Sequence, residues 1–210
     1  MADQGPSARK PRKDVLRNRA EILNVALRHF TDQGIGASLE AIAGEAGVGP
    51  ATLYRHFPSR EALLAAALAA REEELRTRRV EIERIADPDE ALRQWLRALE
   101  DYLSLFNGLP DPVVKALKEP DSPLAASCDK LIEDTDRILA TAQRDGTARD
   151  TVHADTLFLA ALSLAWVKGA RNTDDTRMQT LRVMMATGYM GGPALELENE
   201  KSRHTRHQGG

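Results

Sequence analysis

Cysteine and long apolar runs are scarce in this 210-residue sequence. Cys128 is the only cysteine, which excludes an internal disulfide framework and is compatible with a reducing compartment. No apolar run approaches the roughly 20 residues that a membrane-spanning helix needs. The charged residues 1–19 lack the apolar segment of a secretory signal. These absences predict a soluble, cytoplasmic protein without membrane contact.

Residue patterns for catalysis are also missing. None of the five histidines has a carboxylate or cysteine at the spacing of metal ligands or of a catalytic triad. No glycine-rich loop is suited to holding phosphate. His204 and His207 lie three positions apart in a polar tail, and we interpret that spacing as incidental. We therefore expect no enzymatic activity, no metal and no cofactor. The other histidines are His29, His56 and His153.

Apolar residues recur every three or four positions along most of the chain, which is the spacing of a helix face. No stretch alternates apolar and polar residues between turn residues, as a half-buried strand would. Hydrophobic residues make up 42% of the chain, enough to form a core. The sequence thus predicts an all-α protein of about nine helices without internal repeats.

The charge is unevenly distributed. Residues 1–60 contain nine Lys and Arg against six Asp and Glu, a charge of +3, whereas the whole chain carries −3. A basic head on an acidic body favours contact between the head and a polyanion, although a solvated basic tail explains the charge equally well. We expect residues 1–13 to form a flexible basic arm and residues 193–210 to form a disordered tail.

Capping residues, glycines and prolines divide the first half of the chain into four helices. A helical pattern of apolar residues starts after Asp14, and Gly34 ends that helix. Ser38 suits the cap of a short second helix, which Gly47 breaks. A third helix begins at Pro50, because proline is tolerated in the first turn. The predicted helices of this half span about 14–33, 38–46, 50–57 and 60–85.

The second half opens on a helix start signal, in which Asp87-Pro88 is followed by Glu90. Further glycines and prolines separate the helices that follow. The predicted helices here span about 88–107, 112–118, 123–145, 151–170 and 174–189. We expect one helical domain over 14–74, the head, and a second over 75–192, the body.

The segment 38–57 has the steric pattern of a helix-turn-helix. Two short helices that cross steeply need a small residue at the crossing, which Ala43 supplies. The turn needs a residue that tolerates positive φ, and Gly47 supplies it four positions later. Val48 and Leu53 are then placed to fill the space between the two helices. The spacing therefore predicts a helix-turn-helix over 38–57.

The second helix of this motif has side chains suited to a DNA groove. Its N-terminus presents backbone N–H groups to phosphate, and its first residues are small enough for close approach. Thr52 can touch a thymine methyl or a phosphate, and the residues after it are hydrogen-bond donors. Alternatively, Tyr54 and His56 only cap a small core. The candidate DNA contacts in and around this helix are Gly49, Pro50, Ala51, Thr52, Tyr54, Arg55, His56 and Arg60.

The run 22–63 resembles the DNA-binding head of the tetracycline-repressor (TetR) family of bacterial regulators. The resemblance covers about a quarter of the chain. Glycine at position 49, where many members have serine, weakens the predicted cap of the third helix but leaves the fold unaffected. The matching pieces are Ile22-Leu23, Ala26, Phe30, Gly34, Ile42-Ala43, Ala46-Gly47-Val48, Thr52–Phe57 and Ser59–Leu63.

This resemblance implies a homodimer that binds a near-palindromic operator, usually as a repressor. Each protomer would place its third helix in a major groove, with half-sites about one helical turn apart. By position, Thr52, Tyr54 and His56 would contact the DNA. Ser38 and Arg60 would hold phosphates, and the arm 9–13 would reach further along the backbone.

In the family, the C-terminal half senses a small molecule. Six of the nine aromatic residues lie beyond residue 90, and a cavity lined by them would suit an apolar or aromatic effector. Ordinary core packing is the alternative for each of them. The candidate effector-binding residues are Trp95, Leu99, Tyr102, Phe106, Phe158 and Trp166.

The last two long helices, 151–170 and 174–189, are predicted to form the dimer interface as a four-helix bundle. Effector binding would move the long fourth helix and change the spacing of the two recognition helices, releasing the operator. Besides an enzyme, a protein-docking bundle without DNA binding is the alternative. Binding by such a bundle would ignore salt, whereas phosphate contacts weaken steeply as salt rises.

Overall fold

The computed structural model describes residues 10–169 and 174–191, and in that part of the chain it contains α-helices and no strand. The prediction of an all-α protein is confirmed. The nine helices are α1 (Lys10–Gln33), α2 (Leu39–Glu45), α3 (Pro50–His56), α4 (Arg60–Ile82), α5 (Pro88–Leu103), α6 (Pro110–Ala116), α7 (Ala125–Arg144), α8 (Ala154–Gly169) and α9 (Asp175–Tyr189).

Several helix boundaries differ from the predicted ones. Helix α1 begins at Lys10, because proline at position 11 is tolerated in a first turn, so the last part of the predicted arm is helical. The rest of the arm, 1–9, and the predicted tail, 193–210, lie outside the described residues. Helix α4 ends at Ile82, although Ile85 in the following turn still packs on the core. Helix α6 begins at Pro110 and not at the second proline, Pro112.

Side-chain caps set the start of four helices. In each, an oxygen of the residue before the helix accepts a hydrogen bond from a backbone N–H that has no partner within the helix. Because capping residues can be recognised in the sequence, the predicted starts of these helices are accurate. The caps are Ser38 to the N–H of Ala41, Ser59 to that of Ala62, Asp87 to those of Asp89 and Glu90, and Asp174 to that of Arg177.

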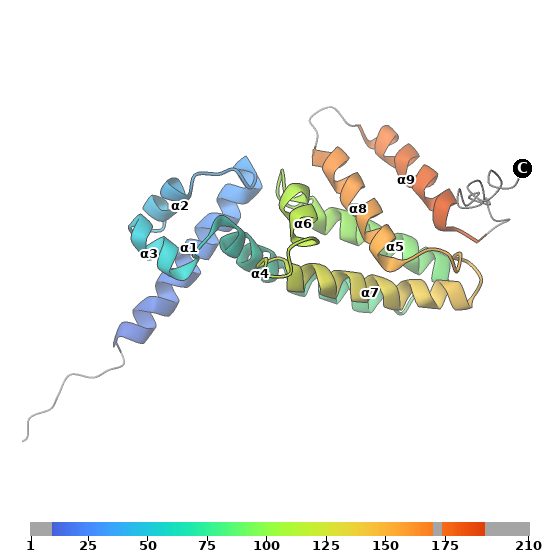
Figure 1. Cartoon of the computed structure of the whole chain (residues 1–210), viewed down its shortest axis with the longest axis horizontal. Helices are drawn as coiled ribbons and strands as arrows, with labels where there is room; N and C mark the ends of the chain where they lie inside the picture. Colours follow the sequence, from blue (N-terminus) through green and yellow to red (C-terminus); the bar gives the residue numbers. More distant parts are fainter. Residues whose placement is uncertain (1–9, 170–173, 192–210) are drawn as a thin grey trace, which may run out of the picture.

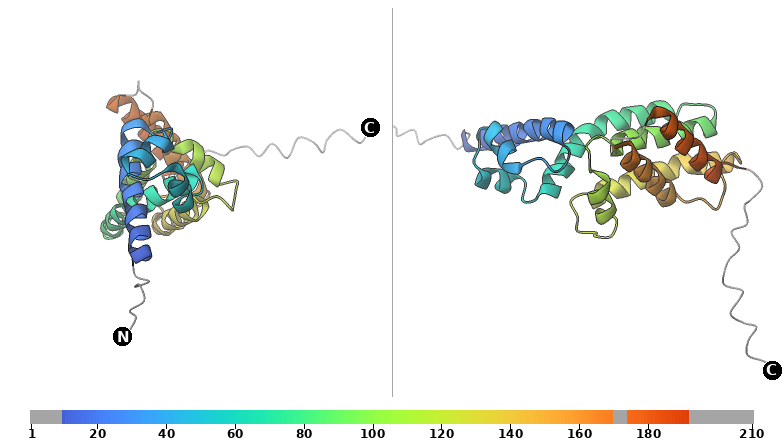
Figure 2. Two further views of the ribbon diagram at one scale, coloured as in Figure 1. Left: turned by 90° about the vertical axis from the view of Figure 1, so that its left-hand side faces the viewer. Right: turned by 90° about the horizontal axis from the view of Figure 1, so that it is seen from above.

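The molecule is elongated and has two parts (Figures 1 and 2). Helices α1, α2 and α3 form the head with the start of α4, and α5 to α9 form the body. Helix α4 runs from the head into the body, where it packs against α5. Helix α5 also contacts α7 and α8, so it lies at the centre of the body. None of the described helices is both long and apolar enough to cross a bilayer.

The core of the head consists of side chains from α1, α2, α3 and α4. Ile22, Ala26 and Phe30 of α1 are completely buried, and Leu53 and Phe57 close the core from α3 and its C-terminus. Burying each of the large side chains contributes about 1.5–3 kcal/mol. The apolar stripe predicted for α1, Leu16, Ala20, Leu23, Leu27 and Phe30, is only partly correct: Phe30 is buried and Leu23 and Leu27 are half-buried, but Leu16 and Ala20 are exposed.

The head and the body also meet at a joint away from α4. The rings of Phe30 and Phe106 lie 5.7 Å apart between centroids and are tilted by 58°. The backbone N–H of Ile35 donates to the carbonyl of Asn107 at 2.9 Å. Gly34 has a φ of +79°, and a Cβ there would lie 2.7 Å from that same carbonyl oxygen. Glycine is therefore required where the loop after α1 passes the end of α5.

Candidate functional site

The turn between α2 and α3 has the geometry that its sequence pattern predicts. Ala43 is fully buried where the helices cross. Gly47 has a φ of +67°, and no atom lies within 4 Å of a Cβ built there. Its glycine is therefore required by backbone conformation and not by crowding. The N–H of Val48 donates to the carbonyl of Ala43 at 3.0 Å and closes the turn.

Helix α3 has one buried face and one exposed face. Leu53 points into the core of the head, as does Phe57 just after the helix. The opposite face is open to solvent, and Tyr54, at 45% exposure, is the largest side chain on it. The outer face is thus free to meet a partner without disturbing the core. Gly49, Pro50, Ala51, Tyr54 and Arg55 are exposed, and Thr52 and His56 are half-buried.

The side chains of Arg55 and Thr52 are joined on the exposed side of α3. Nη2 of Arg55 donates to Oγ1 of Thr52 at 2.8 Å. The guanidinium has five donors, so this bond orients it and leaves other N–H groups for an acceptor. Gly49 at the N-terminus of α3 supplies no side-chain cap. The small residues there would allow close approach of this end to a phosphate.

Helix α1 holds the motif in place through contacts that the sequence analysis missed. Nη1 of Arg19 donates to the carbonyl of His56 at 3.1 Å, and its guanidinium lies 4.4 Å from the centre of the Phe57 ring. Glu45 at the end of α2 accepts from Arg28 at 2.6 Å and pairs with His29 at 2.7 Å. These bonds lower the pKa of Glu45, that from Arg28 most. The partners are 16 to 37 positions apart, so helix periodicity gives no signal for them.

Two residues predicted to hold phosphates are engaged within the head. Nη1 of Arg60 donates to the carbonyls of Ile35 and Ala37, both at 2.7 Å. This bonding fixes the loop before α2, and a phosphate contact would have to use the other N–H groups of Arg60. Ser38 caps α2 and also donates to Glu40 at 3.0 Å, although its side chain is exposed.

The predicted effector-binding residues do not surround one cavity. Leu99 and Phe158 are completely buried in the packed core. Trp95 is equally buried, and its indole N–H donates to Oγ1 of Thr135 at 2.9 Å. The hydroxyl of Tyr102 donates to a backbone carbonyl of α4, and burial raises the pKa of that phenol to about 12. These side chains are therefore packed as ordinary core residues, and the polar groups of Trp95 and Tyr102 have hydrogen-bond partners.

Four of these predicted residues line two small cavities. Trp95 and Tyr102 border a cavity of about 230 Å³ between α4, α5 and α7. Phe106 and Trp166 border another of about 170 Å³. Trp166 is 60% exposed on the outer side of α8, which contradicts a place in an enclosed pocket for most of its ring. The aromatic residues of the body are therefore divided between the core, two small hollows and the surface.

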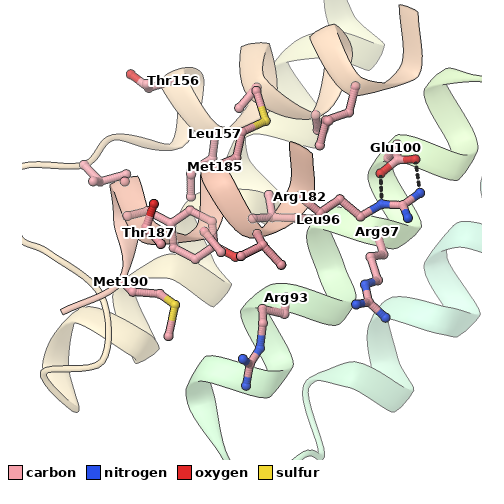
Figure 3. A pocket seen from close by; sticks show the side chains of 18 of the residues that line it. Arg93, Leu96, Arg97, Glu100, Thr156, Leu157, Arg182, Met185, Thr187 and Met190 are labelled. Carbon is pink, nitrogen blue, oxygen red and sulfur yellow. Dashed lines mark hydrogen bonds and ion pairs between the residues drawn. The ribbon is translucent and has the colours of Figure 1, made fainter. Parts of the chain in front are cut away.

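A larger cavity of about 530 Å³ lies between α5, α8 and α9 (Figure 3). Its walls are mainly aliphatic, and a search among aromatic residues therefore misses it. Tyr189 is the one aromatic side chain among its lining residues. The lining residues with large apolar or charged side chains are Glu90, Arg93, Leu96, Arg97, Glu100, Val152, Leu157, Leu164, Arg182, Val183, Met185, Tyr189 and Met190.

A buried ion pair crosses this cavity from α5 to α9. Glu100 is only 1% exposed, and its carboxylate accepts two hydrogen bonds from Arg182, at 2.8 and 2.6 Å (Figure 3). The Glu100 carboxylate raises the pKa of Arg182. Lys168 of α8 is 3.9 Å from the same carboxylate. No apolar pattern predicts this pair, because the partners are 82 positions apart.

Metal binding has no support in the described part of the chain. Within 10–169 and 174–191, no three His, Cys, Asp or Glu side chains are grouped closely enough to hold a metal ion. Cys128 is buried beside Tyr102, and burial raises the pKa of its thiol to about 11. A protonated thiol is a poor nucleophile and a poor metal ligand at neutral pH.

Two family models match the chain, one for each part. The model of bacterial regulatory proteins of the tetR family matches residues 22–67, which lie in the head. The model of the C-terminal domain of SbtR-like transcriptional regulators matches residues 87–188, which are the body. The first match includes the helix-turn-helix, and the second includes the residues that line the cavity between α5, α8 and α9 except Tyr189 and Met190.

Individual relatives agree with these models. An HTH-type transcriptional regulator of Staphylococcus aureus is 31% identical over 96 residues, which are 45% of this chain and 50% of that protein. The match thus spans about half the length of this curated relative. The crystal structure of a TetR transcriptional regulator of Streptomyces coelicolor is 29% identical, with a TM-score of 0.56, over 83% of this chain and 99% of that one.

The fold also matches the crystal structure of RolR in complex with resorcinol, at a TM-score of 0.62 and 17% identity, over 85% of this chain and 90% of that chain. At this identity the similarity concerns the fold alone. The helix-turn-helix geometry, both family models and the similar structures all lead to one assignment. The chain belongs to the TetR family of transcriptional regulators.

Proposed function

We propose that this protein regulates transcription in the cytoplasm by binding a near-palindromic operator as a homodimer, and that it acts as a repressor. The division of α3 into a buried and an exposed face carries this proposal. Leu53 and Phe57 hold the helix in the head, while Tyr54 and Arg55 face outward. A helix presented in this way can enter a major groove without unfolding any part of the head.

The proposed DNA contacts follow from the exposure of α3. Tyr54 and Arg55 would reach the bases or phosphates from the exposed face, and Thr52 and His56 would contact the backbone from its edge. Gly49, Pro50 and Ala51 would let the helix N-terminus approach a phosphate closely. Ser38 and Arg60 are secondary candidates, because both already make hydrogen bonds within the head.

The proposed dimer interface is the outer side of α8 and α9. Large apolar side chains are exposed on both helices, among them Trp166 at 60% and Met184 at 64%. Leu159 is two helical turns before Trp166 on α8, and Val183 is next to Met184 on α9. Exposed apolar side chains concentrated on adjacent helices are typical of an interface. Two such pairs of helices would form a four-helix bundle.

We further propose that a small apolar or aromatic effector releases the operator. RolR, which shares the fold, has been crystallised with resorcinol, and a cavity of about 530 Å³ in this body is large enough for a molecule of that kind. The joint at Phe30 and Phe106 gives the body a direct contact with the head besides α4. An effector that binds one arrangement of this joint more tightly would favour that arrangement. The distance between the two copies of α3 in the dimer would then no longer match the operator.

Selection of bound fragments from the native genome tests the DNA-binding proposal. The purified full chain is incubated with sheared genomic DNA, and the retained fragments are sequenced and footprinted. We expect one or a few inverted-repeat sites whose half-site centres are about one helical turn, roughly 34 Å, apart. Retention of fragments without a common sequence, or no retention at low salt, would contradict the proposal.

A further inference from the structure

The cavity between α5, α8 and α9 combines aliphatic walls with arginine side chains (Figure 3). Leu96, Leu157 and Leu164 are among its apolar residues, and its volume of about 530 Å³ is within the usual range for small-molecule sites. Its charged lining residues are three arginines and two glutamates. The lining therefore has a net charge of +1, which one anionic group would neutralise.

Two of the three arginines are already neutralised by carboxylates. Arg182 is bound by both oxygens of Glu100. Nη2 of Arg93 is 3.3 Å from Glu90, which also lines the cavity, and 2.8 Å from Asp89, which does not. Arg97, one turn after Arg93, makes no hydrogen bond or ion pair with any residue of the described chain. Arg97 is thus the one arginine of the lining that no carboxylate of the described chain pairs with.

Tyr189 supplies a second free donor in the same cavity. Its hydroxyl has no hydrogen-bond partner among residues 10–169 and 174–191. Burial, with a contribution from the charge of Asp89, raises the pKa of this phenol to about 12, and Arg93 and Arg97 act in the opposite direction through their charges. The hydroxyl is therefore protonated at neutral pH and can donate to an anion held by Arg97.

We propose that this cavity binds a small amphipathic carboxylate, with its carboxylate on Arg97 and Tyr189 and its apolar part against α8 and α9. The planar guanidinium suits a carboxylate because it offers two parallel N–H donors. This inference rests on the proposal that the body senses a small molecule, and it adds the place and the chemical class of that molecule. This site lies apart from the effector-binding residues predicted from the sequence, none of which lines this cavity.

Titration calorimetry with decanoate and 2-naphthoate tests this proposal on the full chain. Their neutral counterparts, 1-decanol and 2-naphthol, have nearly the same apolar part and no charge. We expect at least one carboxylate to bind with a dissociation constant at least tenfold below that of its neutral counterpart. Arg97→Met should weaken its binding at least tenfold, whereas Arg97→Lys, which keeps the charge, should retain most of it.

Arg84→Met is the matched control, because Arg84 is an exposed arginine in the turn after α4, outside the lining. Its binding should equal that of the wild type. Circular dichroism of each variant shows that it is folded. The proposal is overturned if neither carboxylate binds the wild type at 1 mM, if the alcohols bind as tightly, or if Arg97→Met and Arg84→Met behave alike.

Operator binding is measured separately by fluorescence anisotropy, so that the two proposals fail independently. Carboxylate binding that depends on Arg97 but leaves operator affinity unchanged supports the cavity proposal and contradicts its role as the effector site. Release of the operator by one of these carboxylates in the wild type but not in Arg97→Met supports both. Operator binding by a chain that takes up neither carboxylate overturns only the cavity proposal.

Discussion

At the residue scale, a glycine with positive φ lies where the head contacts the body. Gly34 has a φ of +79° and lies against the carbonyl of Asn107, whose oxygen accepts the N–H of Ile35. Gly36, two positions later, has no atom within 4 Å of a built Cβ. Both glycines stand in the same predicted turn, and only the structure shows which of them is required.

Gly34→Ala should therefore destabilise the protein, whereas Gly36→Ala should not. The left-handed conformation costs alanine about 1–2 kcal/mol, and the approach to Asn107 adds to that cost. We expect urea unfolding to give a loss of about 2–4 kcal/mol for Gly34→Ala and a change within about 0.5 kcal/mol for Gly36→Ala. Equal midpoints for the two variants would show that the joint tolerates a Cβ.

The buried threonine of α7 is a second residue-scale constraint. Oγ1 of Thr135 accepts the indole N–H of Trp95 and donates to the carbonyl of Leu131. Thr135→Val leaves the indole N–H buried without an acceptor, which costs about 1–3 kcal/mol. Thr141→Val on the exposed side of the same helix is the control. Thermal unfolding should show a lower Tm for the first variant only, and an unchanged Tm would mean that the indole finds another acceptor.

At the scale of elements, the sequence predicts helices more accurately than their contacts. Periodicity and caps identify all nine helices, because both signals are local and depend on neighbouring residues. The contacts that hold α2 and α9, such as Arg28 to Glu45 and Glu100 to Arg182, join residues far apart in the chain. The cavity between α5, α8 and α9 is equally absent from the local sequence pattern, because it depends on how α9 is placed against α5.

The candidate site is predicted to different extents in the two parts. The exposed face of α3 follows from sequence, because a buried Leu53 fixes which residues point outward. In the body, aromatic side chains were an uninformative guide, since Trp95 fills the core and Trp166 lies at the surface. Arg97 could be found only once the partners of Arg93 and Arg182 were known.

Helix α9 should depend strongly on its ion pair with α5. Arg182→Met leaves the buried carboxylate of Glu100 with only Lys168, 3.9 Å away. Losing one partner of a buried pair costs about 3–5 kcal/mol, and the partial exposure of Arg182 places the expected loss at the lower end. Hydrogen exchange should accelerate over α9 while α7 is unchanged. The double variant Glu100→Leu, Arg182→Met should recover part of the loss, and no recovery would contradict a desolvated carboxylate as the cause.

At the scale of the whole molecule, the proposed function needs two copies of the chain. Trp166→Asp places a charge in the proposed interface, and we expect sedimentation velocity to shift from dimer to monomer. Val15→Asp is the control, since Val15 is 52% exposed on α1, in the head. It should remain dimeric. A dimeric Trp166→Asp variant would place the interface elsewhere.

The central claim is that the exposed face of α3 binds operator DNA. The most direct measurement is the fluorescence anisotropy of a labelled operator, recovered by the genomic selection, as a function of protein and salt concentration. Tyr54→Ala and Arg55→Ala should each weaken binding by about 1–3 kcal/mol, roughly 5- to 150-fold, and the control Arg84→Ala should leave it unchanged. Wild-type affinity should fall steeply as salt rises. Operator binding that both α3 variants retain in full, or that does not respond to salt, would contradict the claim.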